Sequence, residues 1–522
     1  MAERYARVLS VGDCAVTVEL GDSLDEGTAC RVRALDERVA DLELAAMLET
    51  VPTYAALLVI YDRRRIAFAE LSARLLSLTE DLPSSGVPGR LVEIQALYDG
   101  DDLDEIARVC GLTRDDVVEM HAGRDYSVLM LGFSPGFAYM GFVDERLRMP
   151  RRKTPRTRVS SGSIAIAGAQ TGVYPRALPG GWNLLGRSSL QLFDPANRDP
   201  SALMPGDRVR FLPTAVLEPP VTVPRLEYGG LGVEVLEPGI LTAIQDAGRP
   251  GLRRVAVPLT GFADPAAARR ANVCVGNSEG APLFELCAPG LHLRFERATF
   301  IALAGASTSA RLERSDLGGG HMTIPMNVAV RVRPSNTLTI TGLQGGARAY
   351  LAVAGMQAPM ILGSASVDLG SGFLRPLDGG DRLSVGSVDS DRVRRAALNE
   401  APRKGPVRVI LGPQLHHFDE GTVATFLSTA WQVGLDSDRV GARLDGPRLR
   451  HEGPAEIVSD GMVPGCIQVP PDGRPIVMLS DCPTTGGYPK IACVVSADLA
   501  LLAQAIPGET SIQFAAVRIE DL

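Results

Sequence analysis

One block of short strands and turns occurs twice in this chain, and it constrains the fold more than any other feature. The first copy reads Gly-x-Ile-x-Ile, Thr-Gly-Val-Tyr-Pro, Pro-Gly-Asp and Phe between Gly162 and Phe211. The second copy keeps this order, with Val, Gly and Glu as replacements, between Gly465 and Phe514. Repeated strands with repeated turn chemistry are typical of one folding unit used more than once. We therefore predict two related β-barrels.

Composition supports short strands over long helices. The chain has 55 Gly and 37 Pro among 522 residues, with 45% hydrophobic residues, which is enough for three or four domains. A net charge of −8 makes nucleic acid an unexpected partner. The N-terminal residues lack the apolar core of a signal peptide and no run of 18 apolar residues occurs, so we expect a cytoplasmic protein without a membrane segment.

The cysteines and histidines do not indicate a metal site. Eight cysteines occur without a Cys-x-x-Cys pair, so we expect reduced core thiols. The adjacent His416 and His417 lack a third ligand at helical spacing. We predict no metal.

The N-terminal part has the pattern of a small α/β unit. Residues 8–21 alternate as a strand, 28–48 have a helical pattern, 53–62 form a second strand and 65–78 a second helix. A linker-like stretch follows at 83–89, then an acidic helix-turn region at 101–121.

The segment from Gly132 to Met140 matches a nucleophile-elbow pattern, Gly-x-Ser-x-Gly, around Ser134. The elbow needs the backbone N–H of the residue after the serine, and Pro135 has none. Ser-Pro-Gly instead suits a type II turn after a strand at 126–131. We predict an aromatic-walled loop whose substrate-binding side chains are Phe133, Phe137 and Tyr139. A hairpin packed on its own core is the alternative.

A dense polar motif near the C-terminus runs from Asp481 to Lys490, after Gln468. Paired glycines allow close backbone approach to a ligand, and two threonine hydroxyls can both donate and accept. Lys490 or Tyr488 can stabilise a developing oxyanion. Our candidates here are Asp481, Tyr488 and Lys490 for catalysis and Gln468, Thr484 and Thr485 for substrate. The alternative is a tight turn with a solvated lysine.

The first barrel offers a counterpart. Tyr174 is a catalytic candidate, and Gln170, Thr171, Arg156 and Arg187 are candidates for substrate, because arginines hold carboxylates bidentately. His121, at the end of a helical pattern, is a candidate base. A histidine stabilised by a helix C-terminus is the alternative.

The order of motifs at 132–140, 150–158, 162–175 and 179–187 resembles the B subunit of the 5-oxoprolinase family, related to allophanate hydrolase subunit 1 and the carboxyltransferase part of urea carboxylase. The stretch 235–251 resembles the start of the C subunit, related to allophanate hydrolase subunit 2. This resemblance covers nearly the whole chain. It implies a mainly β protein with a small N-terminal α/β unit and multiple cyclophilin-like β-barrels.

The expected domains are then as follows: an α/β domain at 1–82, a barrel like the B subunit at 90–213, a linker at 214–229, a first part like the C subunit at 230–401 and a second, cyclophilin-like part of it at 402–522.

The resemblance implies a fused B/C component of an ATP-dependent 5-oxoprolinase, which opens a cyclic amide to glutamate in complex with a separately encoded protein like the A subunit. Homo-oligomers are also possible. The chain contains neither a Gly-x-x-x-x-Gly-Lys-[Ser/Thr] loop nor an Ala-Met-Lys-Met biotin sequence, so ATP is expected to bind with the partner and biotin is not attached here. Two alternatives stay open: a biotin-dependent carboxyltransferase for urea or a related amide, and a regulatory protein like the inhibitors and antagonists of a sporulation kinase.

The chain departs from the family at Ser160-Ser161 and at Cys482-Pro483, which leaves the true substrate open. For geometry, we predict a composite site in which the 133–139 loop and Tyr174 approach residues 484–490. The two copies of the repeat are expected to occupy equivalent barrel positions. Alanine at Tyr174 or Lys490 is expected to remove turnover with little change in melting temperature. Two independent clefts are the alternative.

Overall fold

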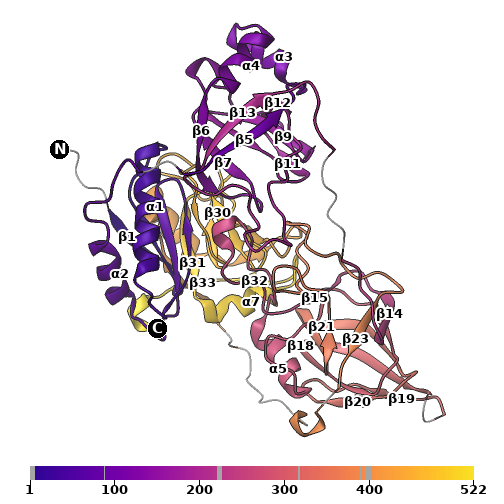
Figure 1. The fold of residues 1–522 in the computed structure, drawn as a ribbon. Helices are drawn as coiled ribbons and strands as arrows, with labels where there is room; N and C mark the ends of the chain where they lie inside the picture. The colour runs from indigo at the N-terminus through magenta and orange to yellow at the C-terminus, as the bar shows by residue number, and fades with distance from the viewer. Residues whose placement is uncertain are drawn as a thin grey trace.

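The computed structural model describes residues 6–86, 89–219, 226–315, 318–387, 389–394, 403 and 405–522. The protein is mostly β, with 35% strand and 17% helix, and its sheets are nearly closed and barrel-like, as predicted. Part of the predicted linker, 220–225, and the predicted boundary at 401–402 lie outside the described residues. In Figure 1 one barrel stands at the top, and the N-terminal domain lies beside the C-terminal barrel although the two are far apart in sequence.

The N-terminal domain is a four-stranded sheet, in the order β1-β2-β4-β3, with two helices. Its elements are β1 (Arg7–Val11), β2 (Ala15–Glu19), α1 (Glu26–Asp41), β3 (Met47–Pro52), β4 (Ala56–Tyr61) and α2 (Phe68–Ser77). The single strand predicted at 8–21 is wrong, because Gly12 takes a positive φ of 68° and the chain turns back into a hairpin. The helix predicted at 28–48 ends at Asp41, and its last residues belong to β3.

The first barrel is a seven-stranded sheet in the order β12-β9-β10-β7-β6-β13-β5. Its elements are β5 (Leu91–Ala96), α3 (Leu103–Cys110), α4 (Arg114–Ala122), β6 (Asp125–Leu131), β7 (Ala138–Gly141), η1 (Glu145–Leu147), β8 (Arg156–Val159), β9 (Ser163–Ala167), β10 (Gln170–Val173), β11 (Leu178–Gly180), β12 (Asn183–Arg187) and β13 (Arg208–Pro213). A bridge between Leu97 and Arg187 joins the two edge strands, with both N···O distances 2.9 Å. This bridge closes the sheet.

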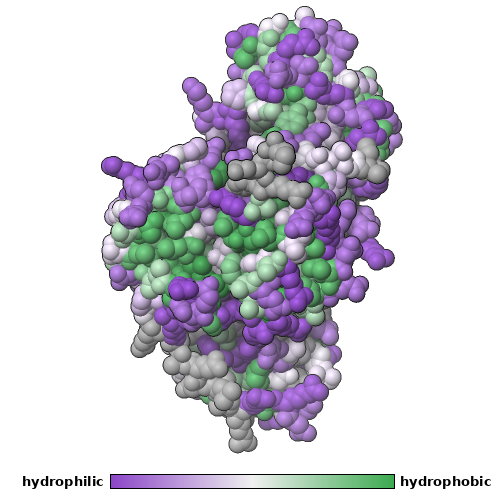
Figure 2. Space-filling view, turned by 90° about the vertical axis from the view of Figure 1, so that its left-hand side faces the viewer, coloured by the Kyte–Doolittle hydropathy of each residue, from purple (hydrophilic) through white to green (hydrophobic). Residues whose placement is uncertain are grey.

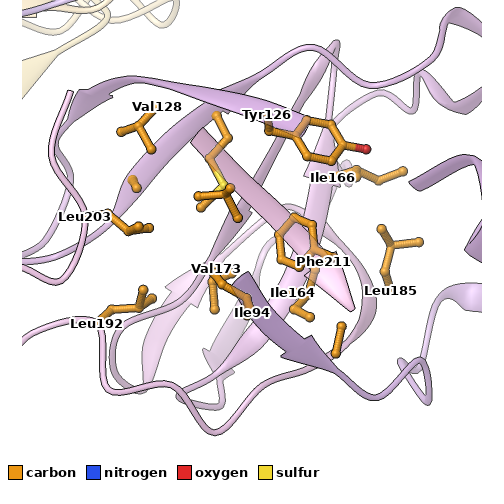
Figure 3. Close-up of a cluster of buried hydrophobic side chains, with 14 of the residues drawn as sticks. Ile94, Tyr126, Val128, Ile164, Ile166, Val173, Leu185, Leu192, Leu203 and Phe211 are labelled. Carbon is orange, nitrogen blue, oxygen red and sulfur yellow. The ribbon is translucent and has the colours of Figure 1, made fainter. Parts of the chain in front are cut away.

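Aliphatic and aromatic side chains from these strands point into the barrel and fill it (Figure 3). Ile164, Ile166 and Phe211 are at most 1% exposed. The alternating strand pattern puts every second side chain on this inner face, which is why the short apolar runs read as strands.

The third unit is a ten-stranded sheet built around two long paired strands, β18 and β21. Its elements are β14 (Gly232–Pro238), β15 (Thr242–Gln245), η2 (Arg253–Val255), α5 (Pro265–Cys274), β16 (Leu283–Leu286), β17 (Leu291–Phe295), β18 (Thr299–Arg314), β19 (Gly320–Thr323), β20 (Val330–Val332), β21 (Thr337–Val353), β22 (Met356–Gln357), β23 (Arg382–Val385) and η4 (Ser390–Arg392).

The C-terminal barrel is an eight-stranded sheet in the order β32-β25-β26-β29-β28-β31-β24-β33. Its elements are β24 (Val407–Leu411), η5 (Leu415–His417), α6 (Glu420–Ser428), β25 (Trp431–Val433), β26 (Gly441–Asp445), β27 (Asp460–Gly461), β28 (Cys466–Gln468), β29 (Ile476–Met478), β30 (Thr485–Gly486), β31 (Lys490–Val494), η6 (Ser496–Asp498), α7 (Leu499–Ala503), β32 (Ser511–Ile512), β33 (Phe514–Ala516) and η7 (Ile519–Asp521). Its edge strands, β32 and β33, are separated by one residue, so its two edges also meet.

The N-terminal domain and the C-terminal barrel share a buried apolar cluster. Val11, Leu58 and Ile60 pack there against Met462 and Cys493. Asp13 also accepts hydrogen bonds from the backbone and hydroxyl of Ser496, both at 2.8 Å. On the face that carries the N-terminal domain, hydrophobic residues gather in patches between polar ones (Figure 2).

Candidate functional site

The turn predicted around Ser134 is present. Phe137 N–H donates to Ser134 O at 2.9 Å and Gly136 has a φ of 78°, which are the features of a type II turn. The turn joins the antiparallel strands β6 and β7. A nucleophile elbow joins a strand to a helix, so this geometry agrees with the exclusion of Ser134 as a nucleophile.

Aromatic rings gather behind this turn. The ring of Phe137 lies 4.8 Å from Tyr139, 5.4 Å from Tyr174 and 5.7 Å from Trp182, centroid to centroid. Phe137 and Tyr174 are buried, whereas Phe133 is 46% exposed. Burial raises the pKa of Tyr139 to about 12, and it also raises the pKa of Tyr174. These phenols therefore stay protonated at neutral pH.

Three domains meet at this aromatic cluster. A Cβ added to Gly132 would lie 2.5 Å from Thr485 Oγ1 and 3.4 Å from the Tyr139 ring, so the start of the loop contacts the C-terminal barrel directly. The N-terminal domain contributes Tyr54, whose ring lies 5.7 Å from that of Tyr139 and whose hydroxyl donates to Gln170 Oε1 at 3.0 Å. We predicted that the 133–139 loop and Tyr174 approach residues 484–490; Gly132, directly before this loop, contacts Thr485, and the approach of Tyr174 stays a prediction. We call this region the junction.

Two polar groups, one at the junction and one next to Thr485 in the sequence, are buried without a hydrogen-bond partner among the described residues. They are Gln170 Nε2 and Thr484 Oγ1, and the hydroxyl of Ser134 in the adjoining turn is a third. Leaving such a group unpaired costs about 1–3 kcal/mol, so orphaned groups are usually satisfied by a ligand, water or ion. One of the two comes from each half of the chain. The junction therefore offers an amide donor and a hydroxyl for a polar ligand.

Lys490 lies beneath the threonine motif and is 0% exposed. Its ammonium donates to Asp460 Oδ2 at 3.0 Å, and Asp460 also accepts from Gly461 N–H and from Thr17 Oγ1 of the N-terminal domain. Because β27 pairs with β30, Asp460 lies opposite Gly486 in the ribbon that carries Thr485. The solvated lysine considered above is therefore wrong. The ammonium of Lys490 is paired within the fold, and a catalytic role for Lys490 stays a prediction.

Asp481 does not face the junction as a free carboxylate. Both its oxygens accept from Arg439 at 2.8 Å, and Arg439 also pairs with Glu285 of the ten-stranded sheet. Burial raises the pKa of Asp481, against the opposing effect of Arg439. This network ties the C-terminal barrel to the third unit. A catalytic role for Asp481 stays a prediction.

His121 occupies the core of the first barrel. Its Nδ1 lies 2.8 Å from the hydroxyl of Tyr98 and its Nε2 lies 2.8 Å from Thr171 Oγ1. Thr171 in turn donates to Ala165 O at 3.2 Å. Burial lowers the pKa of His121 to about 3, so the ring is neutral and both nitrogens are engaged. The structure does not support His121 as the base. It also does not support the alternative of a histidine stabilised by a helix C-terminus, because the neutral ring carries no charge for the helix end to stabilise.

The two copies of the repeat are not equivalent in position, contrary to prediction. Thr171 lies in β10, inside the seven-stranded sheet, with its hydroxyl on His121. Thr485 lies in the two-stranded ribbon β27–β30, outside the eight-stranded sheet. The barrels instead share the parallel pairing of their first and last strands, β5 with β13 and β24 with β33.

The remaining candidates are dispersed. Arg156 pairs with the buried carboxylate of Asp102 at 2.7 Å, so the guanidinium of Arg156 already has a carboxylate partner. Arg152 pairs with the same carboxylate at 2.8 Å. Arg187 pairs with Asp99 at the barrel rim and is 61% exposed. Gln468 is buried and donates to the carbonyl of Tyr488 at 3.4 Å, which places both next to Lys490 rather than in the loop.

Sequence reasoning missed three residues that organise the junction: Tyr54, Trp182 and Asp460. Tyr54 stands in the predicted strand at 53–62 and Trp182 in the 179–187 stretch that carries the family resemblance, but their isolated positions gave no sign of a shared cluster. Asp460 has no local motif at all. In the described ranges, no group of three His, Cys, Asp or Glu side chains is arranged to hold a metal ion, and no helix is long and apolar enough to cross a membrane.

These features define a protein of two barrel-like sheets whose candidate site is built by both halves. Family models agree: "Carboxyltransferase domain, subdomain C and D" matches residues 6–204 and "Carboxyltransferase domain, subdomain A and B" matches residues 255–516. The chain belongs to this carboxyltransferase-domain family, which includes the B and C subunits of 5-oxoprolinase and urea amidolyase.

Relatives match the two halves separately. The chain is 37% identical to the C subunit of 5-oxoprolinase from Escherichia coli K12 over 294 residues, 55% of this chain and 92% of that protein. It is 40% identical to the B subunit of 5-oxoprolinase from Escherichia coli O157:H7 over 211 residues, 40% of this chain and 96% of that protein. The crystal structure of TTHA0988 is 37% identical with a TM-score of 0.84, over 96% of this chain and 99% of that one. Urea amidolyase of Saccharomyces cerevisiae is 30% identical over 56% of this chain and 17% of that protein.

Proposed function

We propose that this chain is the fused B/C component of an ATP-dependent 5-oxoprolinase, which opens the lactam of 5-oxoproline to glutamate together with a separately encoded protein like the A subunit. The observation that carries the proposal is the junction. Each half contributes one buried polar group without a partner among the described residues: Gln170 Nε2 at the junction, and Thr484 Oγ1 next to Thr485 in the sequence. Relatives named as B and C subunits of 5-oxoprolinase match those same halves, which supports the choice of substrate.

A lactam has one N–H donor and one carbonyl acceptor on adjacent atoms. The amide of Gln170 is suited to donate to the carbonyl oxygen, and the hydroxyl of Thr484 is suited to accept from the N–H. Tyr54 fixes the Gln170 side chain by donating to its Oε1. Phe137 and Tyr139 wall the site and exclude water, which strengthens each polar contact.

The reaction we propose has two steps. The γ-phosphoryl group of ATP moves to the lactam oxygen and ADP leaves; water then adds to the activated carbon, the C–N bond breaks, and glutamate and phosphate are released. The chain lacks the Gly-x-x-x-x-Gly-Lys-[Ser/Thr] phosphate loop, so we assign nucleotide binding to the complex with the partner protein. In this scheme Lys490 and Asp460 hold the Thr485 ribbon in place beside the turn.

The test mixes the purified chain with the separately encoded A-type partner, 5-oxoproline and ATP, and measures glutamate and ADP together. Equal release of both is expected. Thr484→Val and Gln170→Leu, which keep side-chain size, should each lower kcat/KM roughly tenfold to a hundredfold. Thr242→Val is the matched control, because its hydroxyl is also buried and unpaired but lies in β15 of the third unit. Folded proteins that release neither product would overturn the proposal.

A biotin-dependent carboxyltransferase acting on urea or a related amide is the second candidate. It is favoured by the description of both matching family models and by the urea amidolyase relative. The chain carries no Ala-Met-Lys-Met sequence, so the biotin carrier would be another protein. Transfer of carboxylate from carboxybiotin to urea, without glutamate release from 5-oxoproline, would decide for this candidate.

A further inference from the structure

A cavity of about 1010 Å³ borders the Ser134 turn at Pro135, and Thr485 is not among the residues that line it. Its walls come from the first barrel, from residues 215–219 and 226 of the connection between the halves, and from residues 361–376 of the third unit. The relatives from Escherichia coli match the two halves as separate proteins, so residues 215–219 and 226 of this wall belong to the segment that joins the two halves here.

One cation in the wall lacks a carboxylate partner. Arg176 is half-buried, and no Asp or Glu oxygen of the described residues lies within 4.0 Å of its guanidinium. The guanidinium donates a hydrogen bond to the carbonyl of Gly370. Burial lowers the pKa of Arg176, with Asp368 acting against this from farther away. A desolvated guanidinium with unused N–H groups favours an anion.

The other charged groups of the wall are already engaged or exposed. Arg375 pairs with Asp381 at 2.6 Å and Arg187 pairs with Asp99 at 2.8 Å. Glu218 is exposed on the connecting segment. Two hydroxyls of the wall, those of Ser189 and Ser371, make no hydrogen bond among the described residues. The open polar groups of the wall thus include the Arg176 guanidinium and these two hydroxyls.

The rest of the wall is apolar and partly unburied. Val216, Leu226 and Leu369 are 79%, 44% and 65% exposed, although large aliphatic side chains at a domain boundary are normally covered. Phe193 and Phe373, with ring centroids 5.9 Å apart, close one side. A cavity of this size, with mostly apolar walls and few polar groups, fits a small-molecule site.

We propose that this cavity binds an amphipathic anion, a carboxylate or a phosphate monoester, with its head group on Arg176 and its apolar part against Phe193, Phe373 and Leu369. The site is separate from the junction. The cavity wall includes Pro135, whereas Gly132 at the start of the same loop contacts Thr485. Binding is therefore measurable without any amide turnover, so failure of this proposal and failure of the 5-oxoprolinase proposal are distinguishable.

The experiment titrates the full-length chain with octanoate, octyl phosphate and the neutral octanol, by ligand-observed NMR and calorimetry. At least one of the two anions is expected to bind saturably and more tightly than octanol. The preferred anion identifies the head group.

Three variants localise the binding. Arg176→Met is expected to lower the affinity for the anion about tenfold or more and to leave the affinity for octanol unchanged. Arg158→Met is the matched control, because Arg158 is an exposed arginine of β8 that is not in the wall. Ser189→Trp, which keeps Arg176 and places a large side chain in the cavity, should weaken binding of both anions.

Three results overturn the proposal: no saturable binding of either anion to the folded wild type up to about 10 mM, equal affinity for octanol and the anions, or unchanged affinity in folded Arg176→Met and Ser189→Trp.

Discussion

Replacing Lys490 with methionine should destabilise the C-terminal barrel strongly, in contrast to the small change expected from the sequence alone. The substitution keeps the length of the side chain and removes its charge. Asp460, whose side chain is 7% exposed, would keep its bonds from Thr17, Gly461 and Gln414 but lose its only cation within the described chain. Breaking a buried pair from one side costs about 3–5 kcal/mol, because the remaining charge stays desolvated.

The assay uses the two tryptophans. Trp431 is fully buried in the C-terminal barrel and Trp182 lies in the first barrel, so a Trp182→Phe background leaves one reporter of the barrel in question. With a urea dependence of about 2 kcal/mol per M, a loss of about 4 kcal/mol moves the unfolding midpoint by roughly 2 M. The double variant Lys490→Met/Asp460→Asn carries neither charge and should recover more than half of the loss.

The control is Arg74→Met, which removes an exposed ion pair with Glu70 and should change stability by less than about 0.5 kcal/mol. If Lys490→Met unfolds within about 1 kcal/mol of its background, or if the double variant is no more stable than the single one, the reasoning from a buried pair is refuted.

Three further outcomes follow from the geometry. The pKa of His121 falls from 6.5 to about 3 on folding, so the contribution of the neutral ring to stability is fully present above pH 6.5 and is lost as the pH falls toward 3. Between pH 7 and 5 this loss amounts to about 2 kcal/mol of unfolding free energy. His121→Gln should therefore flatten this part of the pH profile of urea midpoints. Gly132→Ala should lower the free energy of unfolding in urea by about 1–3 kcal/mol and should also lower turnover, because its Cβ would lie 2.5 Å from Thr485 Oγ1. Gly320→Ala is the control, because the space around Gly320 is open, and it should change neither quantity. Arg439→Met should speed proteolysis and hydrogen exchange where the third unit meets the C-terminal barrel, because Glu285 and Asp481 both lose their bridge; equal rates in Arg439→Met and the exposed Arg518→Met would contradict this.

The fold class and the turn at Ser134 follow from local patterns in the sequence. Short alternating runs, many glycines and prolines, and a repeated motif order required β-barrels, because these are local patterns that set strand faces and turn types. Pro135 excluded a nucleophile elbow by lacking an N–H, and the structure has the turn that its neighbours favour. The contact of this loop with the threonine motif was also predictable from motifs in both halves.

The environment of each polar side chain depends instead on partners that are far away in the sequence. Lys490 became buried and paired because Asp460, 30 residues away, and Thr17, 443 residues from Asp460, surround the charge. His121 became neutral because the first barrel closed around it, and Arg156 was matched by Asp102, 54 residues away. Burial and long-range partners set the charge, the pKa and the accessibility of a side chain, and the local sequence predicts neither the burial nor the partners.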